Sequence, residues 1–235
     1  MKKLSIIIPA YNEEPTILKV LNRVNDTKTK KISYQLIVVD DASNDNTRNV
    51  LESNSHLYDL LICNEQNEGK GGSIRKAIEK ATGDYIIFQD ADLEYDPIDI
   101  IKFIDVFLEF DADVIIGSRF SYDRYTKSHS FYNKIGNKLI TLCFNLLYNT
   151  TFMDIYSCYL CFKKDLIKSS ELTTDGFEQQ AEILSKIVSK SKNYYEVPIN
   201  YSGRSIEEGK KIRWYHIFGV MKEIIRGKFT KWKRK

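Results

Sequence analysis

The segment Tyr85–Asp92 reads YIIFQDAD, a short apolar run that ends in two acids separated by Ala91. Such a run, bounded by polar residues, predicts a strand buried on both faces of a sheet. Two carboxylates that leave a buried strand repel each other unless a cation lies between them. A hard divalent ion removes that repulsion and takes oxygen ligands from carboxylates and phosphates. We therefore expect Asp90 and Asp92 to bind a hard divalent cation, with Glu94 as a further oxygen ligand.

The alternative role for these two acids is to cap the helix that follows. Acids favour helix N-termini, and residues 97–110 have an apolar helical pattern. Asp96 and Pro97 already supply a cap for that helix. Capping therefore leaves Asp90 and Asp92 unexplained, and a metal site is the better interpretation.

Further strand-like runs lie on either side of this segment and alternate with helical patterns. The strand-like runs cover residues 4–9, 34–39, 60–63 and 113–117, and the helical patterns cover residues 17–24, 47–52, 74–81 and 97–110. Alternation at this spacing predicts an α/β fold with a mostly parallel sheet and helices on both faces. Ligands of such sheets bind beyond the carboxyl ends of the strands. We expect Asp41, Asp90 and Arg119 to lie at that edge, because each follows a strand.

Two further segments near this edge have side chains suited to a nucleotide. Asp41 ends the second strand, where an acid can accept hydrogen bonds from a ribose or a base; a turn or cap acid is the alternative. Residues 67–72 read NEGKGG, in which glycines permit close backbone approach and Lys70 can neutralise phosphate charge. They lack the P-loop pattern, and a plain turn is the alternative there.

The composition is that of a globular protein. Of 235 residues, 43% are hydrophobic and 29% are charged, which predicts one domain with or without an appendage. Cys158 and Cys161 form a C-x-x-C pair without a second pair or a histidine cluster, so buried thiols are expected over a zinc site. No stretch reaches the roughly 18 uninterrupted apolar residues of a spanning helix. We expect a cytoplasmic protein without a signal peptide.

The positive charge is concentrated at the C-terminus. Residues 222–235 contain seven Lys or Arg and one acid, whereas the other 221 residues sum to −3. This asymmetry argues against a nucleic-acid-binding surface over the whole fold. Apolar residues recur at helical spacing in residues 131–148 and in residues 214–232, a pattern suited to an anionic membrane surface. The alternative is a helix packed on the domain with a solvated tail.

Taken in order, the motifs resemble the inverting family 2 glycosyltransferases of GT-A fold, in particular the dolichol-phosphate mannosyltransferase-like branch. The resemblance covers residues 4–165 well and extends to about residue 214 more weakly. The matching segments are Ile8–Glu13, Val38–Ser43, Asn67–Gly71, Gly83–Asp84, Asp90–Leu93, Pro97, Gly117–Arg119, Tyr201–Ser205 and Glu208–Ile212. It implies a Rossmann-like GT-A domain at residues 1–213, followed by a basic amphipathic helix or tail at residues 214–235.

The resemblance also implies a nucleoside pocket and a diphosphate site. Pro9, Tyr11, Glu13 and Asp41 would line the pocket, with Lys70 nearby. Mg or Mn held by the two acids of the D-A-D motif would bridge the diphosphate of a GDP- or UDP-sugar.

Other phosphate contacts are implied for three basic residues. Arg119, Arg204 and Lys210 would address the phosphates of the donor or the acceptor. The basic segment that contains Arg204 and Lys210 would order over the donor, because an anion can organise such a loop; a solvated loop is the alternative.

The implied reaction is inverting transfer of a hexose to a polyprenyl (dolichyl or undecaprenyl) phosphate on the cytoplasmic face of a membrane. The same donor could serve a hydroxyl of a cell-surface or glycoprotein glycan, which would need a base. Asp154 and Glu178 are the base candidates, although Cys158 and Tyr159 replace the small residues usual after Asp154. A catalytically silent nucleotide-sugar-binding scaffold is the non-enzyme alternative, but the acids and Arg119 that such a protein would be expected to lose are present.

Overall fold

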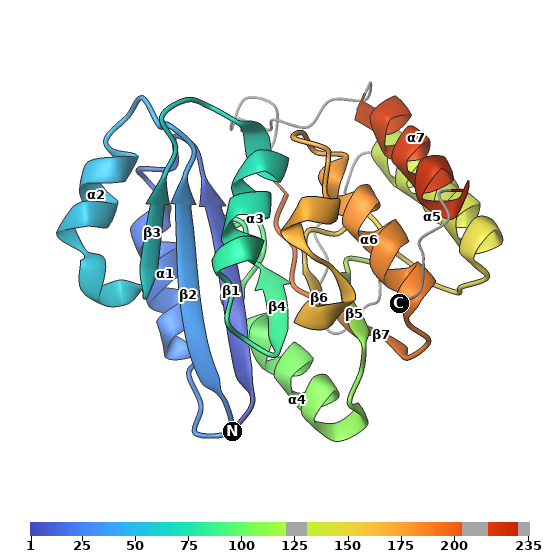
Figure 1. Ribbon diagram of the computed structural model, residues 1–235, viewed down its shortest axis with the longest axis horizontal. Coiled ribbons are helices and arrows are strands. Elements are labelled where there is room, and N and C mark those ends of the chain that lie inside the picture. Colours follow the sequence, from blue (N-terminus) through green and yellow to red (C-terminus); the bar gives the residue numbers. More distant parts are fainter. Residues whose placement is uncertain (121–130, 204–215, 230–235) are drawn as a thin grey trace.

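The computed structural model describes residues 1–120, 131–203 and 216–229, which form a seven-stranded sheet with helices on both faces (Figure 1). The strand order is β3-β2-β1-β4-β6-β5-β7. The strands are β1 (Lys3–Ala10), β2 (Ser33–Asp40), β3 (Leu60–Cys63), β4 (Tyr85–Phe88), β5 (Val114–Ser118), β6 (Leu160–Lys163) and β7 (Tyr194–Pro198). Neighbours are parallel except that β6 runs antiparallel to both β4 and β5. The predicted mostly parallel α/β sheet is confirmed.

Seven α-helices lie within the described residues. They are α1 (Ile17–Asp26), α2 (Thr47–Ser53), α3 (Gly69–Lys80), α4 (Ile100–Phe110), α5 (Phe131–Tyr148), α6 (Gln179–Lys190) and α7 (His216–Phe229). Four short 3-10 turns accompany them at Ser55–Leu57, Pro97–Asp99, Lys164–Leu166 and Ser169–Glu171. Among the described residues, no helix is long and apolar enough to cross a bilayer.

The central strand β1 shows why the apolar runs form buried strands. Successive side chains point to opposite faces of a strand, and Ile6, Ile7 and Ile8 are all fully buried. Ile6 and Ile8 pack with residues of α1, α2 and α4, whereas Ile7 packs with residues of α3, α5, α6 and α7. A strand covered on both faces requires apolar residues at every position, which explains why the run is continuous.

Three details differ from the expectations. The antiparallel strand β6 was not predicted, because its pairing with β4 and β5 joins segments that are far apart in sequence. Helix α3 begins at Gly69 and not near residue 74, because packing overrides the poor helix propensity of its glycines. The apolar pattern of residues 195–201 predicts a strand up to Tyr201, but β7 ends at Pro198, and Tyr201 forms an isolated bridge with Tyr95.

The carboxyl ends of β1, β2 and β4 meet at one edge of the sheet, where the chain turns sharply. Asn12, Ala42 and Leu93 each have a positive φ, at 54°, 57° and 61°, just beyond these three strands. Left-handed backbone at non-glycine residues is uncommon and is often found at functional sites. The same edge carries the acids that the sequence indicated.

The Gly83–Asp84 pair joins β4 to β1 at the opposite edge. The Gly83 N–H donates to the Ser5 hydroxyl at 2.9 Å, and Asp84 accepts from the Lys3 N–H at 2.7 Å. A Cβ on Gly83 would lie 2.6 Å from the Ser5 nitrogen and 2.8 Å from the Tyr85 carbonyl oxygen. Only glycine fits between these backbone atoms, so this pair sets how β4 sits against β1.

We predict that Gly83→Ala lowers the free energy of unfolding by about 1–3 kcal/mol, because backbone atoms must shift to admit the methyl group. Gly136→Ala is the control, since an added Cβ there meets no atom within 4 Å. It should leave stability unchanged or raise it by up to about 1 kcal/mol, because alanine favours the helix. Urea denaturation monitored by circular dichroism measures both, and equal midpoints for the two variants would contradict the packing argument.

Candidate functional site

The first acid of the D-A-D motif is bound to an ammonium group. Asp90 lies just beyond β4, and its Oδ1 accepts a close hydrogen bond from Lys70 Nζ in the first turn of α3. The two side chains are only 15% and 21% exposed. Burial alone would lower the pKa of Lys70, but the Asp90 carboxylate and the Cys158 thiol outweigh it and raise that pKa. Lys70 is therefore a stand-in cation at Asp90.

The second acid, Asp92, is partly buried, and its Oδ1 accepts from the Glu94 N–H at 3.0 Å. The Glu94 carboxylate accepts from the Tyr201 hydroxyl at 2.8 Å. Burial, followed by this neighbouring carboxylate, raises the pKa of Tyr201. Glu94 is thus held by the segment that leads into residues 204–215.

These acids fit Mg²⁺ or Mn²⁺ if a phosphate-bearing ligand supplies the remaining oxygen atoms. Within the described ranges, no three His, Cys, Asp or Glu side chains converge to form a complete metal site. Mg²⁺ is commonly held by one or two carboxylates together with phosphate oxygens and water. The donor set of Asp90 and Asp92, with a cation already seated on one of them, suits an ion of this class.

Asp41 connects the tip of β2 to the turn before α3. It is 3% exposed, and its Oδ1 accepts from Asn64 Nδ2 at 2.7 Å and from the Glu68 N–H at 2.9 Å. The Asp41 N–H donates to the Ala10 carbonyl at 2.9 Å, which holds the ends of β1 and β2 together. Asp41 therefore positions the start of α3, and with it Lys70.

The other three residues predicted for a nucleoside pocket lie at the end of β1 or just beyond it. Pro9 and Tyr11 are partly exposed, and the Tyr11 hydroxyl accepts from Asn44 at 3.3 Å. Glu13 is 6% exposed and accepts from the Thr16 hydroxyl at 3.0 Å. The fold brings these residues and Asp41 to the same end of the sheet, because β1 and β2 are parallel neighbours that end side by side.

The glycines of α3 pack against a loop of the protein itself. A Cβ on Gly69 would overlap the Asp175 carbonyl oxygen, and one on Gly71 would lie 2.5 Å from the Thr174 carbonyl oxygen. The Gly71 N–H donates to the Asp175 carbonyl at 2.7 Å. The glycines were expected to let a ligand approach the backbone closely. In the structure, the loop that precedes α6 lies against them.

Arg119 follows β5 and is fixed by Asp154. Arg119 Nε donates to Asp154 Oδ2 at 2.7 Å, and Nη2 donates to Oδ1 at 2.8 Å. Asp154 is fully buried, and the Arg119 side chain is 11% exposed. Burial would lower the pKa of Arg119, but Asp154 outweighs it and raises that pKa. Both carboxylate oxygens of Asp154 are therefore engaged by one guanidinium group.

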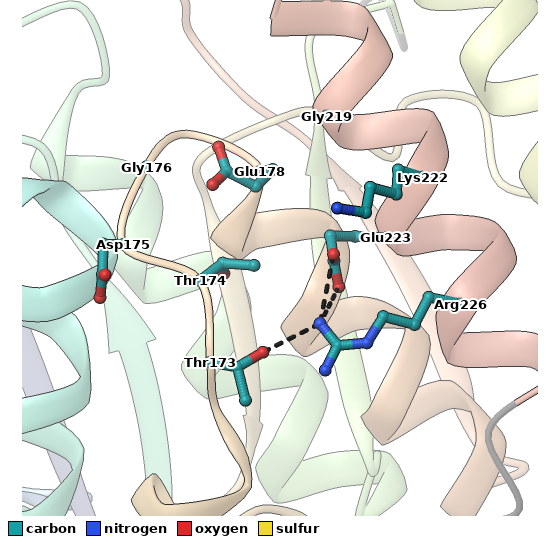
Figure 2. Close-up of a pocket in the computed structure, with 9 residues that line it drawn as sticks. All are labelled: Thr173, Thr174, Asp175, Gly176, Glu178, Gly219, Lys222, Glu223 and Arg226. Atoms are coloured by element: carbon teal, nitrogen blue, oxygen red, sulfur yellow. Dashed lines mark hydrogen bonds and ion pairs between the residues drawn. The ribbon is translucent and has the colours of Figure 1, made fainter.

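Glu178, the other candidate base, lies beside a cavity of about 410 Å³ between the loop before α6 and helix α7 (Figure 2). Two of the acids at this cavity are paired, Asp175 with Arg75 at 2.8 Å and Glu223 with Arg226 at 3.3 Å. The Glu178 carboxylate makes no hydrogen bond within the described part of the chain. The lining residues are Thr173, Thr174, Asp175, Gly176, Glu178, Gly219, Lys222, Glu223 and Arg226.

Tyr156 lies within the electrostatic influence of several of these groups, and the sequence pattern did not indicate it. Burial raises its pKa first, Cys158 and Glu178 raise it further, and Lys70 and Arg119 oppose them. These charges are therefore close enough to act on one side chain. Its hydroxyl is buried and has no hydrogen-bond partner in the described structure. No motif or spacing marks this tyrosine, so only the fold reveals it.

Two residues predicted to contact phosphates, Arg204 and Lys210, lie outside the described residues. Most of the other predicted site residues lie just beyond the carboxyl ends of β1, β2, β4 and β5. Lys70 lies in the first turn of α3, and Glu178 lies immediately before α6.

Comparison with solved structures shows the fold. Glucosyl-3-phosphoglycerate synthase from Mycobacterium tuberculosis, in complex with Mn²⁺, UDP and phosphoglyceric acid, is similar with a TM-score of 0.68 and 16% identity, over 96% of this chain and 77% of that chain. TarS from S. aureus in complex with UDP-GlcNAc is similar with a TM-score of 0.66 and 18% identity, over 96% of this chain and 66% of that chain. The chain has the architecture of GT-A glycosyltransferases.

Sequence relatives extend the comparison. Dolichol-phosphate mannosyltransferase of Pyrococcus furiosus is 29% identical over 94% of this chain and 64% of its own length. Glycosyltransferase AglJ of Haloferax volcanii is 29% identical over 85% of this chain and 63% of its own length. The chain thus spans a little under two thirds of the length of these relatives. Residues 5–169 match the family described as Glycosyl transferase family 2, and because that match covers most of the chain, the chain belongs to this family.

Proposed function

We propose that this chain is an inverting, metal-dependent hexosyltransferase that moves a sugar from a nucleoside-diphosphate sugar, with GDP or UDP as the nucleotide, to a polyprenyl phosphate. One arrangement supports this most directly: Asp41, Asp90 and Asp92 lie at the carboxyl ends of nearby strands, with Lys70 seated on Asp90. The similarity to a dolichol-phosphate mannosyltransferase and to UDP-bound structures agrees with it.

The donor would lie across this sheet edge. Its nucleoside would contact Pro9, Tyr11, Glu13 and Asp41, and its diphosphate would lie near Lys70. Mg²⁺ or Mn²⁺ held by the D-A-D acids would offset the negative charge that develops on the leaving diphosphate. Lys70 adds a cation next to the same phosphates, and the N-terminus of α3 adds the positive end of a helix dipole.

The acceptor would approach Arg119. A polyprenyl phosphate is already anionic, so it needs little help from a base when its oxygen attacks the anomeric carbon from the side opposite the diphosphate. A guanidinium group suits phosphate because it presents several N–H donors in a fixed plane. Asp154 is buried and bound through both oxygens. In this proposal Asp154 orients Arg119 and does not remove a proton.

One observation favours a second acceptor class, the hydroxyl of a glycan. Glu178 borders the cavity in Figure 2, and its carboxylate makes no hydrogen bond in the described structure. A hydroxyl acceptor requires a base within reach of its proton, and Glu178 is placed at an accessible hollow where Asp154 is not. In that case Glu178 would be the base.

A peripheral membrane location is supported by α5 and α7, which pack side by side (Figure 1). Both helices bury one side and expose apolar residues on another. The exposed residues are Ile135, Leu139, Leu142 and Leu146 on α5, and Phe218, Ile225 and Phe229 on α7. Seven basic residues from residue 222 onward would meet anionic headgroups. We propose that this surface, here called the α5–α7 face, lies on the cytoplasmic face of a membrane.

The donor site can be tested by thermal unfolding with UDP or GDP. A ligand at roughly 100 times its Kd adds about 2.7 kcal/mol of stability, so we expect one of the two nucleotides to raise Tm strongly in the presence of Mn²⁺. Asp92→Asn should remove most of the Mn²⁺-dependent part, and Asp105→Asn, on the exposed side of α4, should not. No shift with either nucleotide in the unaltered chain would contradict the proposed donor.

The role of Asp154 can be tested with a double-mutant cycle. If Asp154 acts only through Arg119, then Asp154→Asn, Arg119→Gln and the double variant should lower kcat/KM for a prenyl phosphate by similar factors, roughly 100-fold each. Transfer to farnesyl phosphate from the nucleotide-sugar found active gives these values. Losses that multiply in the double variant would instead indicate an independent catalytic role for Asp154.

The α5–α7 face can be tested by vesicle flotation. Leu142→Glu places a charge at a side chain that is 53% exposed on α5, and we expect binding to vesicles with anionic lipids to fall at least about tenfold. Leu108→Glu makes the same change at a 39% exposed leucine of α4. It should leave vesicle binding unchanged, and equal losses for both variants would count against this face.

A further inference from the structure

We infer that Lys70 competes with the divalent cation for Asp90, and that the donor diphosphate relieves this competition by drawing Lys70 away. This inference rests on the proposed donor chemistry and adds an order to it: the cation binds well only when the nucleotide is present. Lys70 would then both contact the donor and keep the cation site closed without it.

The structure places the ammonium of Lys70 on the carboxylate that the divalent cation would also need. The ammonium of Lys70 binds Asp90 Oδ1 and also lies 3.3 Å from Cys158 Sγ, so two polar groups hold it in place. Both partners of the ion pair are mostly shielded from water. Such a pair is stronger than one on the surface, where solvent screening leaves little net attraction. A divalent ion that approaches Asp90 must therefore displace a well-held ammonium.

The rest of the site offers such an ion little compensation. Asp92 is the other acid of the motif, and its Oδ1 already accepts the Glu94 N–H. The described residues supply no third acid, histidine or cysteine that would complete a metal site. Without nucleotide, a divalent ion would have to share Asp90 with Lys70, so its affinity should be low.

A diphosphate changes both the pairing of Lys70 with Asp90 and the number of oxygen ligands available to the divalent ion. It brings several anionic oxygens to the edge where α3 begins, and Lys70 lies in the first turn of that helix on a flexible side chain. Once Lys70 pairs with phosphate, the Asp90 carboxylate becomes available to the ion, and the diphosphate can supply further oxygen ligands. Because coupling between two ligands is reciprocal, the ion must strengthen nucleotide binding by the same factor.

Lys70→Met separates this role from simple phosphate binding, because it removes the ammonium and nearly keeps the side-chain volume. Mn²⁺ binding is measured by electron paramagnetic resonance without nucleotide and again with saturating UDP, or GDP if UDP does not bind. We expect Mn²⁺ alone to bind the variant several-fold more tightly than the unaltered chain, whereas the nucleotide with Mn²⁺ binds more weakly. The coupling factor between the two should fall by roughly tenfold.

Three further variants complete the experiment. Lys80→Met removes an exposed lysine from the last turn of the same helix and should change neither affinity. Lys70→Arg keeps the charge and should keep Mn²⁺ binding weak without nucleotide. Lys70→Gln serves as a second neutral variant if Lys70→Met proves unstable in thermal unfolding.

The decisive outcome is the sign of the change in Mn²⁺ affinity without nucleotide. Unchanged or weaker Mn²⁺ binding to both neutral variants would overturn the competition and leave Lys70 as a phosphate ligand only. If neither nucleotide binds the unaltered chain with Mn²⁺, the proposed donor fails instead, even if the Mn²⁺ result alone supports the competition. The two ideas can therefore fail separately.

Discussion

Acids gathered near the carboxyl ends of the parallel strands repel one another, and the site depends on how the charge of each acid is balanced. Asp41 is balanced by hydrogen bonds from Asn64 and the Glu68 backbone, Asp90 by the ammonium of Lys70, and Asp154 by the guanidinium of Arg119. Unpaired charges at this depth would be costly. Each acid is therefore balanced before any ligand arrives, and at Arg119 the charge is already in place, which is the condition for electrostatic stabilisation without rearrangement.

The ion pairs at Asp154 and Asp90 differ in how easily a ligand can break them. Asp154 is fully buried and holds Arg119 through two parallel hydrogen bonds, a geometry that fixes the guanidinium plane. Lys70 contacts Asp90 with a single flexible amine, and both groups retain some exposure. In the proposed reaction, the first pair would present a fixed cation to the acceptor. The second is suited to exchange when a diphosphate and a metal ion arrive together.

Much of this arrangement follows from local sequence, and the remainder does not. The buried strand before Asp90 could be predicted because a strand covered on both faces must be apolar at every position. Strand β6 could not, because its pairing with β4 and β5 joins residues distant in sequence. The same holds for the Arg119–Asp154 pair, which is 35 residues apart. The resemblance named both residues, but only packing decides that Asp154 faces Arg119 and not solvent.

The contact between α3 and the loop before α6 has a consequence for engineering the protein. Gly69 and Gly71 admit the backbone of Thr174 and Asp175 so closely that neither segment can shift without the other. Lys70 and Glu178 therefore lie on two parts of a single interlocked joint. If Lys70 binds the donor and Glu178 serves the acceptor as proposed, a chimaera that imports this loop from a relative would need the matching helix start as well, because a change on the acceptor side would otherwise disturb the donor side.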